Sequence, residues 1–168
     1  MGHHFLEISN INYNMLQGNF NPYITNISDK KDLSTKASKW FSEKWGIDEK
    51  VYFESIESSF NSKTTPQWYL ALDKNIIIVG AGIIQNDFHN RKDLEPNLCA
   101  LYVEENYRGN KISSQLLKFI KNDLKTKNIN KFYLLIELVG FYEKYGGIFI
   151  ENIIDNEAYS LRVYKIEF

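Results

Sequence analysis

Arg108, Gly109 and Lys111 form the part of the chain whose residue types could hold a phosphate group. An apolar run at 98–103 ends shortly before them, and from Lys111 apolar residues recur at helical spacing. A strand, a tight turn and a helix therefore follow one another. The first turn of a helix has unpaired backbone N–H groups and a partial positive charge, which together attract phosphate. Gly109 allows close backbone approach and Arg108 adds a fixed charge, although an ordinary strand-to-helix corner explains the same residues equally well.

A polar loop at 86–97 holds the densest set of groups that could accept a proton: Asp87, His89, Asp93 and Glu95. A solvated loop explains each of them taken singly. His89 has no second histidine four residues later, and no cysteine pair is present, so we expect no metal site. The single Cys99 excludes an internal disulfide and is expected to be a small core residue.

Two other kinds of chemistry are not indicated. The segment 79–82 contains two glycines of a dinucleotide-binding motif, but Gln85 stands at the third position and a polar loop follows. Glycines within a strand more often mark a bulge or a close backbone approach. The chain also has no plausible Ser-His-Asp or Cys-His arrangement, so no covalent nucleophile is expected.

The elements that would position these residues follow from apolar periodicity. We expect a short strand or loop in the N-terminal extension 1–22, and strands at 23–27, 68–72, 76–84, 98–103, 131–137, 148–153 and 160–167. Helices are expected at 33–45, 48–60, 111–127 and, briefly, 140–147, with Ser28 or Asp29 as a cap of the first. A strand, a helix and a strand around 111–127 predict a parallel pair with a right-handed crossover.

The turn resembles the pyrophosphate-binding signature of the GCN5-related N-acetyltransferases (GNAT family), which is Gln or Arg, two residues, Gly, one residue, then Gly or Ala. Arg108 opens the pattern, Lys111 stands at the middle glycine and Ser113 at the final small residue. The resemblance implies acetyl-CoA as cosubstrate. The residues that it implies in cofactor binding are Leu101, Tyr102, Val103, Arg108, Gly109, Asn110, Lys111, Ile112, Ser113 and Ser114.

A second family element is similar to 141–146, Phe-Tyr-Glu-Lys-Tyr-Gly, which follows the fifth strand of the family's sheet. The resemblance implies that Tyr142 is the general acid that protonates the departing thiolate, with Tyr145 as the neighbouring alternative. It implies Glu95 as the first candidate for the general base, with Asp93 and Glu137 behind it. Water chains do this work in other members.

The resemblance covers about 23–168 and implies an α/β fold of the acyl-CoA N-acyltransferase type. In that fold a mixed, largely antiparallel seven-stranded sheet has a central parallel pair and helices on both faces. Two consecutive helices after the first strand build a wall of the acceptor pocket, so Tyr52, Glu54 and Glu57 are candidates for facing the acceptor, although a solvated helix face explains them as well.

Composition limits the partners. A chain of 168 residues with formal net charge -1 is expected to be one domain over 1–168, with no basic field for nucleic acid or an anionic membrane. No apolar run approaches the length of a membrane helix and no signal peptide is evident, so a cytoplasmic location is expected. The sequence leaves open whether the chain forms a homodimer and whether His3 and His4 are native.

We therefore predict an N-acetyltransferase in which a small, cationic amine attacks acetyl-CoA directly. Carboxylates near the expected pocket favour a cationic acceptor. Two alternatives remain: an acyl-CoA-binding or regulatory domain that has lost turnover because of Lys111, and an enzyme that acetylates protein or peptide amines.

Overall fold

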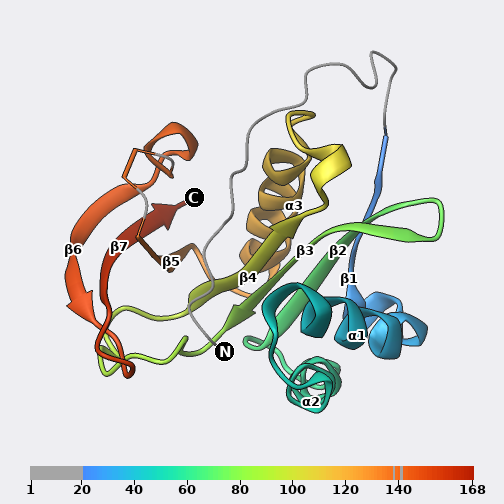
Figure 1. Ribbon diagram of the computed structural model, residues 1–168, viewed down its shortest axis with the longest axis horizontal. Coiled ribbons are helices and arrows are strands. Elements are labelled where there is room, and N and C mark those ends of the chain that lie inside the picture. Colours follow the sequence, from blue (N-terminus) through green and yellow to red (C-terminus); the bar gives the residue numbers. More distant parts are fainter. Residues whose placement is uncertain (1–20, 138, 141) are drawn as a thin grey trace.

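The computed structural model describes residues 21–137, 139–140 and 142–168. Most of the expected N-terminal extension, including His3 and His4, lies outside these residues. Seven strands form one sheet in the order β1-β2-β3-β4-β5-β7-β6, and only β4 and β5 are parallel (Figure 1). The strands are β1 Tyr23–Asn26, β2 Gln67–Asp73, β3 Ile76–Ile84, β4 Asn97–Val103, β5 Lys131–Ile136, β6 Ile148–Ile154 and β7 Ser160–Glu167.

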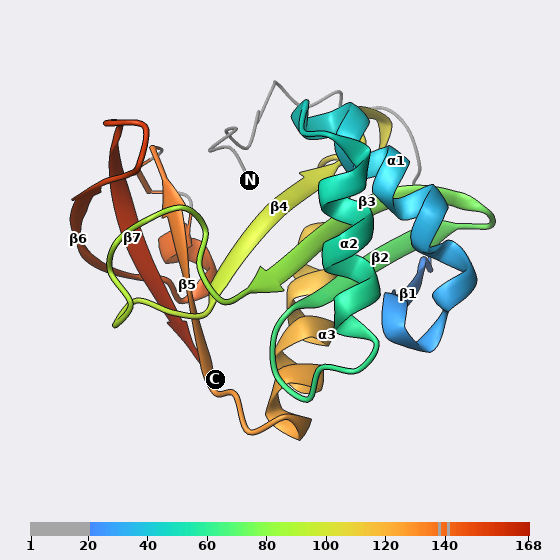
Figure 2. The same cartoon turned by 90° about the horizontal axis from the view of Figure 1, so that it is seen from below.

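Three α-helices cover the two faces of this sheet. Figure 2 shows α1 and α2 together on one face and α3 on the other. They are α1 Ser34–Trp45, α2 Glu49–Ser59 and α3 Ile112–Thr126. Short 3₁₀ helices are η1 Ile27–Asp29, η2 Lys31–Leu33, η3 Glu105–Tyr107 and η4 Tyr142–Tyr145. The expected mixed α/β fold is confirmed, with the parallel pair at its centre and helices on both faces.

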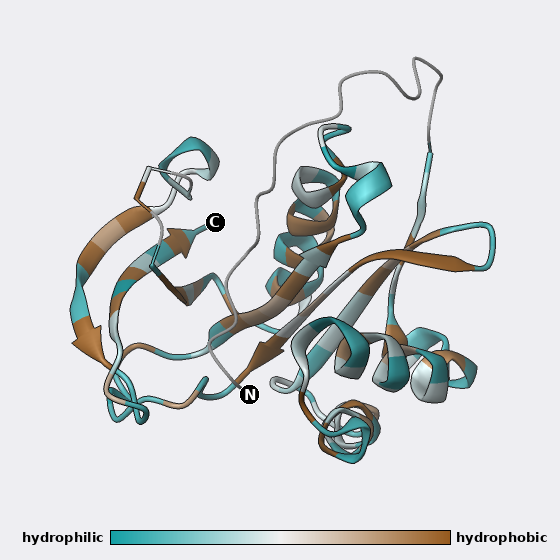
Figure 3. Ribbon diagram, viewed as in Figure 1, coloured by the Kyte–Doolittle hydropathy of each residue, from teal (hydrophilic) through white to brown (hydrophobic). Residues whose placement is uncertain are grey.

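Each face of the sheet has its own core. Ile112, Leu116 and Ile120 of α3 pack on one face together with Phe132 of β5, and Tyr164 of β7 belongs to the same cluster. The α1 and α2 face is aromatic, and its largest members are Trp40, Phe41, Trp45, Tyr52 and Trp68. The central strands are coloured as apolar over most of their length in Figure 3, which agrees with burial on both faces.

Gly80 and Gly82 show why β3 contains small residues. A Cβ on Gly80 would lie 2.6 Å from the Trp40 ring, and one on Gly82 would lie 2.7 Å from the Trp68 ring. The register between β3 and β4 also shifts between these glycines. Both expectations for glycine in a strand, close approach and a bulge, are confirmed.

The expected cap of the first long helix is wrong. Ser28 and Asp29 lie in η1, and α1 begins only at Ser34 without a side-chain cap. Asn26 instead accepts a hydrogen bond of 2.9 Å from the Ser28 backbone N–H, so the chain makes two short turns first. The helix ends as expected, at Gly46 in the left-handed conformation. None of the helices in the described part of the chain is long and apolar enough to cross a membrane.

Candidate active site

The central feature of the site is the separation of β4 from β5. The two strands share a single paired position, Asn97 with Tyr133, beside a hydrogen bond of 2.8 Å from the Tyr133 N–H to the Pro96 carbonyl. Beyond it the strands diverge, as Figure 1 shows. The Glu104 N–H points towards β3, where it donates to Ile78. Because successive peptide groups of a strand alternate in direction, those of Val103 and Leu101 face the opposite side, towards β5.

A bulge in β4 lies next to these groups. Ala100 has φ 52°, a left-handed value that is unusual for a residue with a side chain, and it falls where the register with β3 shifts. The Trp45 indole N–H donates to the Ala100 carbonyl at 3.2 Å. A side chain of α1 therefore holds the bulge in place.

Arg108 folds back on the end of β4. Its Nε donates to the Val103 carbonyl at 3.0 Å, and its guanidinium lies 5.4 Å from the centre of the Tyr102 ring. The Tyr102 ring also meets Trp40 and Trp45 edge-on, at 5.8 and 6.0 Å between ring centroids. These contacts fix the guanidinium beside the opening between β4 and β5.

The N-terminus of α3 faces the same region without a side-chain cap. Gly109 has φ 83° and Lys111 has φ 58° and ψ 21°, so both adopt the left-handed conformation. This is the conformation for which glycine has no steric cost, and it explains why the family's pattern has glycine at the Lys111 position. The Lys111 side chain itself is exposed, while Ser113 and Ser114 are half-buried. Asn110 steadies the turn with a hydrogen bond of 3.3 Å to the Tyr107 carbonyl.

Tyr142 lies at the start of η4, after β5. Its side chain is 2% exposed and packs into the core that includes α3. Burial raises the pKa of Tyr142 above its usual range, so the phenol stays protonated at neutral pH. Tyr145, the alternative, is half-buried and lines a shallow pocket with Lys118 and Lys121 of α3.

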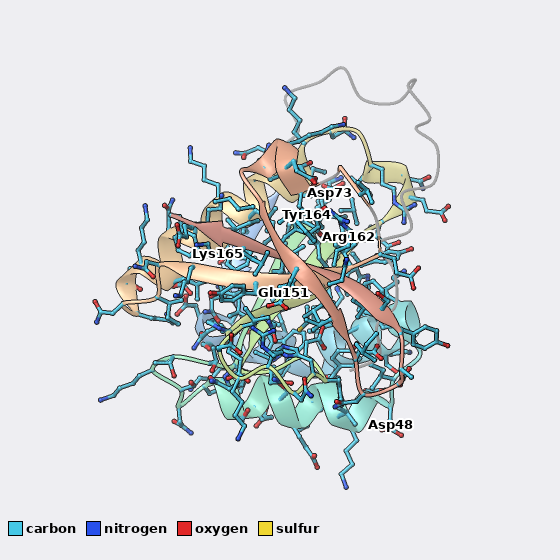
Figure 4. All side chains as sticks on the ribbon, turned by 90° about the vertical axis from the view of Figure 1, so that its left-hand side faces the viewer. Asp48, Asp73, Glu151, Arg162, Tyr164 and Lys165 are labelled. Carbon is cyan, nitrogen blue, oxygen red and sulfur yellow. The ribbon has the colours of Figure 1, made fainter. Side chains whose placement is uncertain are left out.

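A polar chain attaches η4 to the sheet. Arg162 Nε donates to Tyr164 Oη at 3.0 Å, and Tyr164 Oη donates to the Glu143 carboxylate at 2.8 Å. Figure 4 shows Tyr164 and Arg162 side by side on β7. The Arg162 guanidinium also lies 4.0 Å from the centre of the Phe149 ring.

The candidate base Glu95 lies just before β4, at the end of that strand opposite to Arg108. It is half-buried and accepts hydrogen bonds from the Gln85 amide at 2.6 Å and the Asn86 amide at 2.8 Å. Asp93 instead accepts two hydrogen bonds from Arg91, of 2.8 and 2.7 Å. These bonds are the main reason why the pKa of Asp93 is lowered to about 2.

The structure also buries two polar side chains that the sequence did not single out as buried. Tyr52 of α2 and Asp87 of the loop after β3 are both buried, and within the described part of the chain Tyr52 Oη and Asp87 Oδ1 have no hydrogen-bond partner. Cys99 of β4 is buried as well, as expected. Glu54 and Glu57, the other candidates on α2, are exposed. The sequence showed that acidic residues are dense at 86–97, but it did not show that Asp87 is the buried one. Among the described residues no group of three His, Cys, Asp or Glu side chains could hold a metal ion.

The architecture defines an acyltransferase-type site, with a separated parallel pair beside an uncapped helix N-terminus. The family model for an acetyltransferase (GNAT) domain matches residues 65–146. No protein of curated function matches the sequence significantly. The fold agrees with this match, so residues 65–146 are similar to the acetyltransferase (GNAT) domain.

Solved structures of low sequence identity share the fold. Aminoglycoside 6'-N-acetyltransferase complexed with coenzyme A is 16% identical with a TM-score of 0.62, and the match covers 85% of this chain and 94% of that one. The putative acetyltransferase yncA from Salmonella typhimurium, with acetyl-CoA, is 8% identical with a TM-score of 0.67, over 87% and 93%. A chain of the NatC complex bound to Gag peptide and CoA is 16% identical with a TM-score of 0.63, over 89% and 99%.

Proposed function

We propose that the chain binds acetyl-CoA between β4 and β5 and transfers its acetyl group to the primary amine of a small, cationic acceptor. The observation that carries this proposal is the single residue pair joining β4 to β5, Asn97 with Tyr133. Strands that separate here leave the peptide groups of Leu101 and Val103 to be satisfied by a ligand. The match of residues 65–146 to the GNAT domain, and structural neighbours determined with coenzyme A or acetyl-CoA, support this cosubstrate.

The residues present fit a molecule with a pyrophosphate at one end and amides along its length. The uncapped N-terminus of α3, with Gly109 and the Arg108 guanidinium beside it, suits the pyrophosphate. The main chain at 101–103 suits the pantetheine amides. The turn from Asn110 to Ser114 completes the phosphate end. The Val103 carbonyl already accepts one hydrogen bond from Arg108 and keeps a second lone pair for a ligand.

The chemistry follows from the positions of Tyr142 and Glu95. An alkylammonium has a pKa near ~10, so it must lose a proton before its nitrogen can attack. We assign that role to a carboxylate at the start of β4, where the sequence indicates Glu95, at the far end of the strand from the phosphate turn. Tyr142, kept protonated by burial, would supply a proton to the departing thiolate. The remaining contribution is positioning.

A small amine is favoured by the carboxylates on the acceptor side, Glu95 and Asp87. Two structural neighbours are aminoglycoside 6'-acetyltransferases, whose substrates carry several ammonium groups. A second acceptor class is a peptide amine, because another structural neighbour is a chain of the NatC complex bound to a peptide. A panel of diamines, aminoglycosides and peptides, assayed by thiol release, separates these classes.

Lys111 favours one non-catalytic alternative, an acyl-CoA-binding or regulatory domain. A residue with a side chain in the left-handed conformation occupies the position at which the family pattern has glycine. Calorimetric titration of the wild type and Lys111→Gly with acetyl-CoA, CoA and ATP tests both readings. Micromolar binding of acetyl-CoA without binding of ATP would establish the cofactor, and the amine panel then tests for turnover. Binding only by Lys111→Gly supports the non-catalytic domain, and no binding by either refutes the proposed function.

A further inference from the structure

The polar segment 86–97 carries the chain from β3 into β4 but lies against the other half of the sheet. Its residue Leu94 is buried in a cluster with one residue each of β5, β6 and β7, namely Tyr133, Ile153 and Val163. Figure 2 shows the loop reaching across to these strands. The loop therefore spans the closed end of the gap between β4 and β5, where Asn97 pairs with Tyr133.

Two polar contacts fix the outer side of this loop. Arg91 Nη1 lies 2.6 Å from Glu151 Oε1 of β6, and the Asn156 backbone N–H, after β6, donates to the Phe88 carbonyl at 3.2 Å. Phe88 has φ 60°, a left-handed value that is unusual for a bulky side chain. Such a conformation persists only where the surrounding contacts determine it. The loop is therefore held in one conformation from outside.

Asn97, the first residue of β4, organises the inner side of the loop. Its side chain is fully buried. The Oδ1 atom accepts a hydrogen bond of 2.9 Å from the Asp87 backbone N–H and lies 2.8 Å from His89 Nε2. The Nδ2 atom donates to the Leu94 carbonyl at 2.8 Å. One side chain thus binds the loop at three points.

These contacts determine where the His89 ring carries its proton. The Asn97 amide cannot be reversed, because its Nδ2 faces a carbonyl oxygen and its Oδ1 faces a backbone N–H. An amide oxygen only accepts, so His89 Nε2 must be the donor. On the other side of the ring, Nδ1 accepts a hydrogen bond of 3.1 Å from the Arg91 backbone N–H. The buried ring therefore has its proton on Nε2 and uses both nitrogens.

A continuous hydrogen-bonded path leads from this ring to Glu95. The His89 backbone N–H donates to Asn86 Oδ1 at 3.0 Å, and Asn86 Nδ2 donates to Glu95 Oε1 at 2.8 Å. The other carboxylate oxygen accepts a hydrogen bond of 2.6 Å from the Gln85 amide. Glu95 is thus connected through Asn86 and His89 to Asn97, at the one position where β4 and β5 pair.

We infer that Asn86, His89 and Asn97 are positioning residues, which hold Glu95 in a fixed place at the closed end of the gap between β4 and β5. This inference rests on the proposed function, which places Glu95 on the side of the acceptor amine. A carboxylate on a loop samples several rotamers unless its partners immobilise it, and a displacement of about 1 Å is enough to slow a reaction strongly.

The network serves the acceptor and not the cofactor. Arg108 and the uncapped start of α3 lie at the opposite end of β4 from Asn97. Loss of the network should therefore change the kinetics with the amine and leave the binding of acetyl-CoA as it is. A substitution that merely damaged the fold would weaken both.

The first test measures acetyl transfer to 1,4-diaminobutane by thiol release. His89→Leu removes both hydrogen bonds of the ring, and we expect kcat/KM for the diamine to fall roughly 10- to 100-fold. His89→Gln keeps an N–H donor for Asn97 and should recover most of this loss. The Kd for acetyl-CoA, measured by calorimetry, should be unchanged in both variants. Wild-type kinetics in His89→Leu would overturn the inference.

Asn86→Ala interrupts the same path at a half-buried side chain, so it spares the core around His89. Its loss of kcat/KM should be similar. The double variant with His89→Leu should lose no more than either single variant, because both changes break one path. Asn90→Ala, at an exposed asparagine of the same loop, is the matched control and should behave as wild type. Fully additive losses would contradict the path.

The second test does not depend on turnover. Nitrogen NMR should find the ring proton of His89 on Nε2, and the side-chain amide of Asn86 should exchange with solvent faster in His89→Leu than in wild type or His89→Gln. If both results hold but the chain neither binds acetyl-CoA nor acetylates the diamine, the network is supported and the proposed function fails. A ring proton on Nδ1, or an Asn86 exchange rate that His89→Leu leaves unchanged, would overturn the inference.

Discussion

Tyr164 Oη donates a hydrogen bond of 2.8 Å to the Glu143 carboxylate, and this bond connects β7 to the short helix that carries Tyr142. Tyr164 is fully buried, and its ring lies 6.4 Å from that of Tyr142. The position of the proposed general acid therefore depends on a strand that is far in the sequence from the turn at the start of α3.

Replacement of Tyr164 by Phe removes this hydrogen bond and the acceptor of Arg162 Nε. Because the Glu143 carboxylate is exposed to solvent, which weakens this bond, we expect a measurable but small loss of stability. Urea denaturation measures it, and Tyr159→Phe, at an exposed tyrosine, is the control. Equal stability of the two variants would show that η4 is held by packing alone.

Substitution of Tyr142 by Phe should lower kcat by roughly 10- to 100-fold at unchanged Kd for acetyl-CoA, because only protonation of the leaving thiolate is lost. Steady-state kinetics with a thiol reagent, alongside calorimetry, gives both values. Tyr145→Phe, made in parallel, decides between the two tyrosines. A larger kcat effect in that variant would transfer the role to Tyr145.

Lys111→Gly should stabilise the fold by up to about 1 kcal/mol. The left-handed conformation costs a residue with a side chain about 1–2 kcal/mol, and part of this gain is offset by the greater backbone entropy of glycine in the unfolded chain. Lys118→Gly is the matched control, because Lys118 lies inside α3 and should lose about 1 kcal/mol. If Lys111→Gly and Lys118→Gly lost the same amount of stability, the left-handed conformation of Lys111 would be contradicted.

Gly80→Ala should be clearly destabilising, by about 1–3 kcal/mol, since the new methyl group would overlap the Trp40 and Phe41 rings. Thermal denaturation measures the effect. Gly46→Ala has no atom within 4 Å of its new Cβ and carries only the cost of φ 70°. If both glycines tolerated alanine equally, α1 would not pack on β3 as closely as described.

Stability should fall as the pH rises from about 4 to about 7. The pKa of Asp87 is about 7 in the folded chain, above its ordinary value of 3.8, so folding binds a proton throughout this interval. Asp93, Glu143 and Glu167 have lowered pKa values and act in the opposite direction, chiefly at and below their ordinary values of 3.8 for Asp and 4.5 for Glu. Urea denaturation at pH 5 and pH 8 should show the loss in wild type and a smaller one in Asp87→Asn. A pH dependence that Asp87→Asn leaves intact would assign it to another group.

The strand and helix positions could largely be predicted from the sequence, because apolar periodicity and turn residues act locally. The segments that form β3 and β4 are nearly continuous apolar runs, which predict buried strands. Gly46 follows the last apolar residue of the helical pattern and, as predicted, ends α1. The predicted cap of α1 was wrong because Ser28 and Asp29 belong to η1. The side chain of Asn26, which precedes η1, accepts the hydrogen bond of the Ser28 backbone N–H.

The site could be predicted only in part. The turn proposed to bind phosphate is one continuous segment, and the sequence predicts the start of α3 within one residue. Tyr52 and Asp87 come from different elements, and only the fold shows that both side chains are buried. Similarly, nothing local indicates that β4 and β5 share a single pair.

That single pair has a consequence for the mechanics of the sheet. Strands β1 to β4 form one hydrogen-bonded unit and β5 to β7 another, and the main chain scarcely joins them. Side chains of α3 share one buried core with strands of both units, so this helix connects the two units across the gap between β4 and β5. The two halves of the sheet are thus held together mainly by side-chain packing, and little by main-chain hydrogen bonds between β4 and β5.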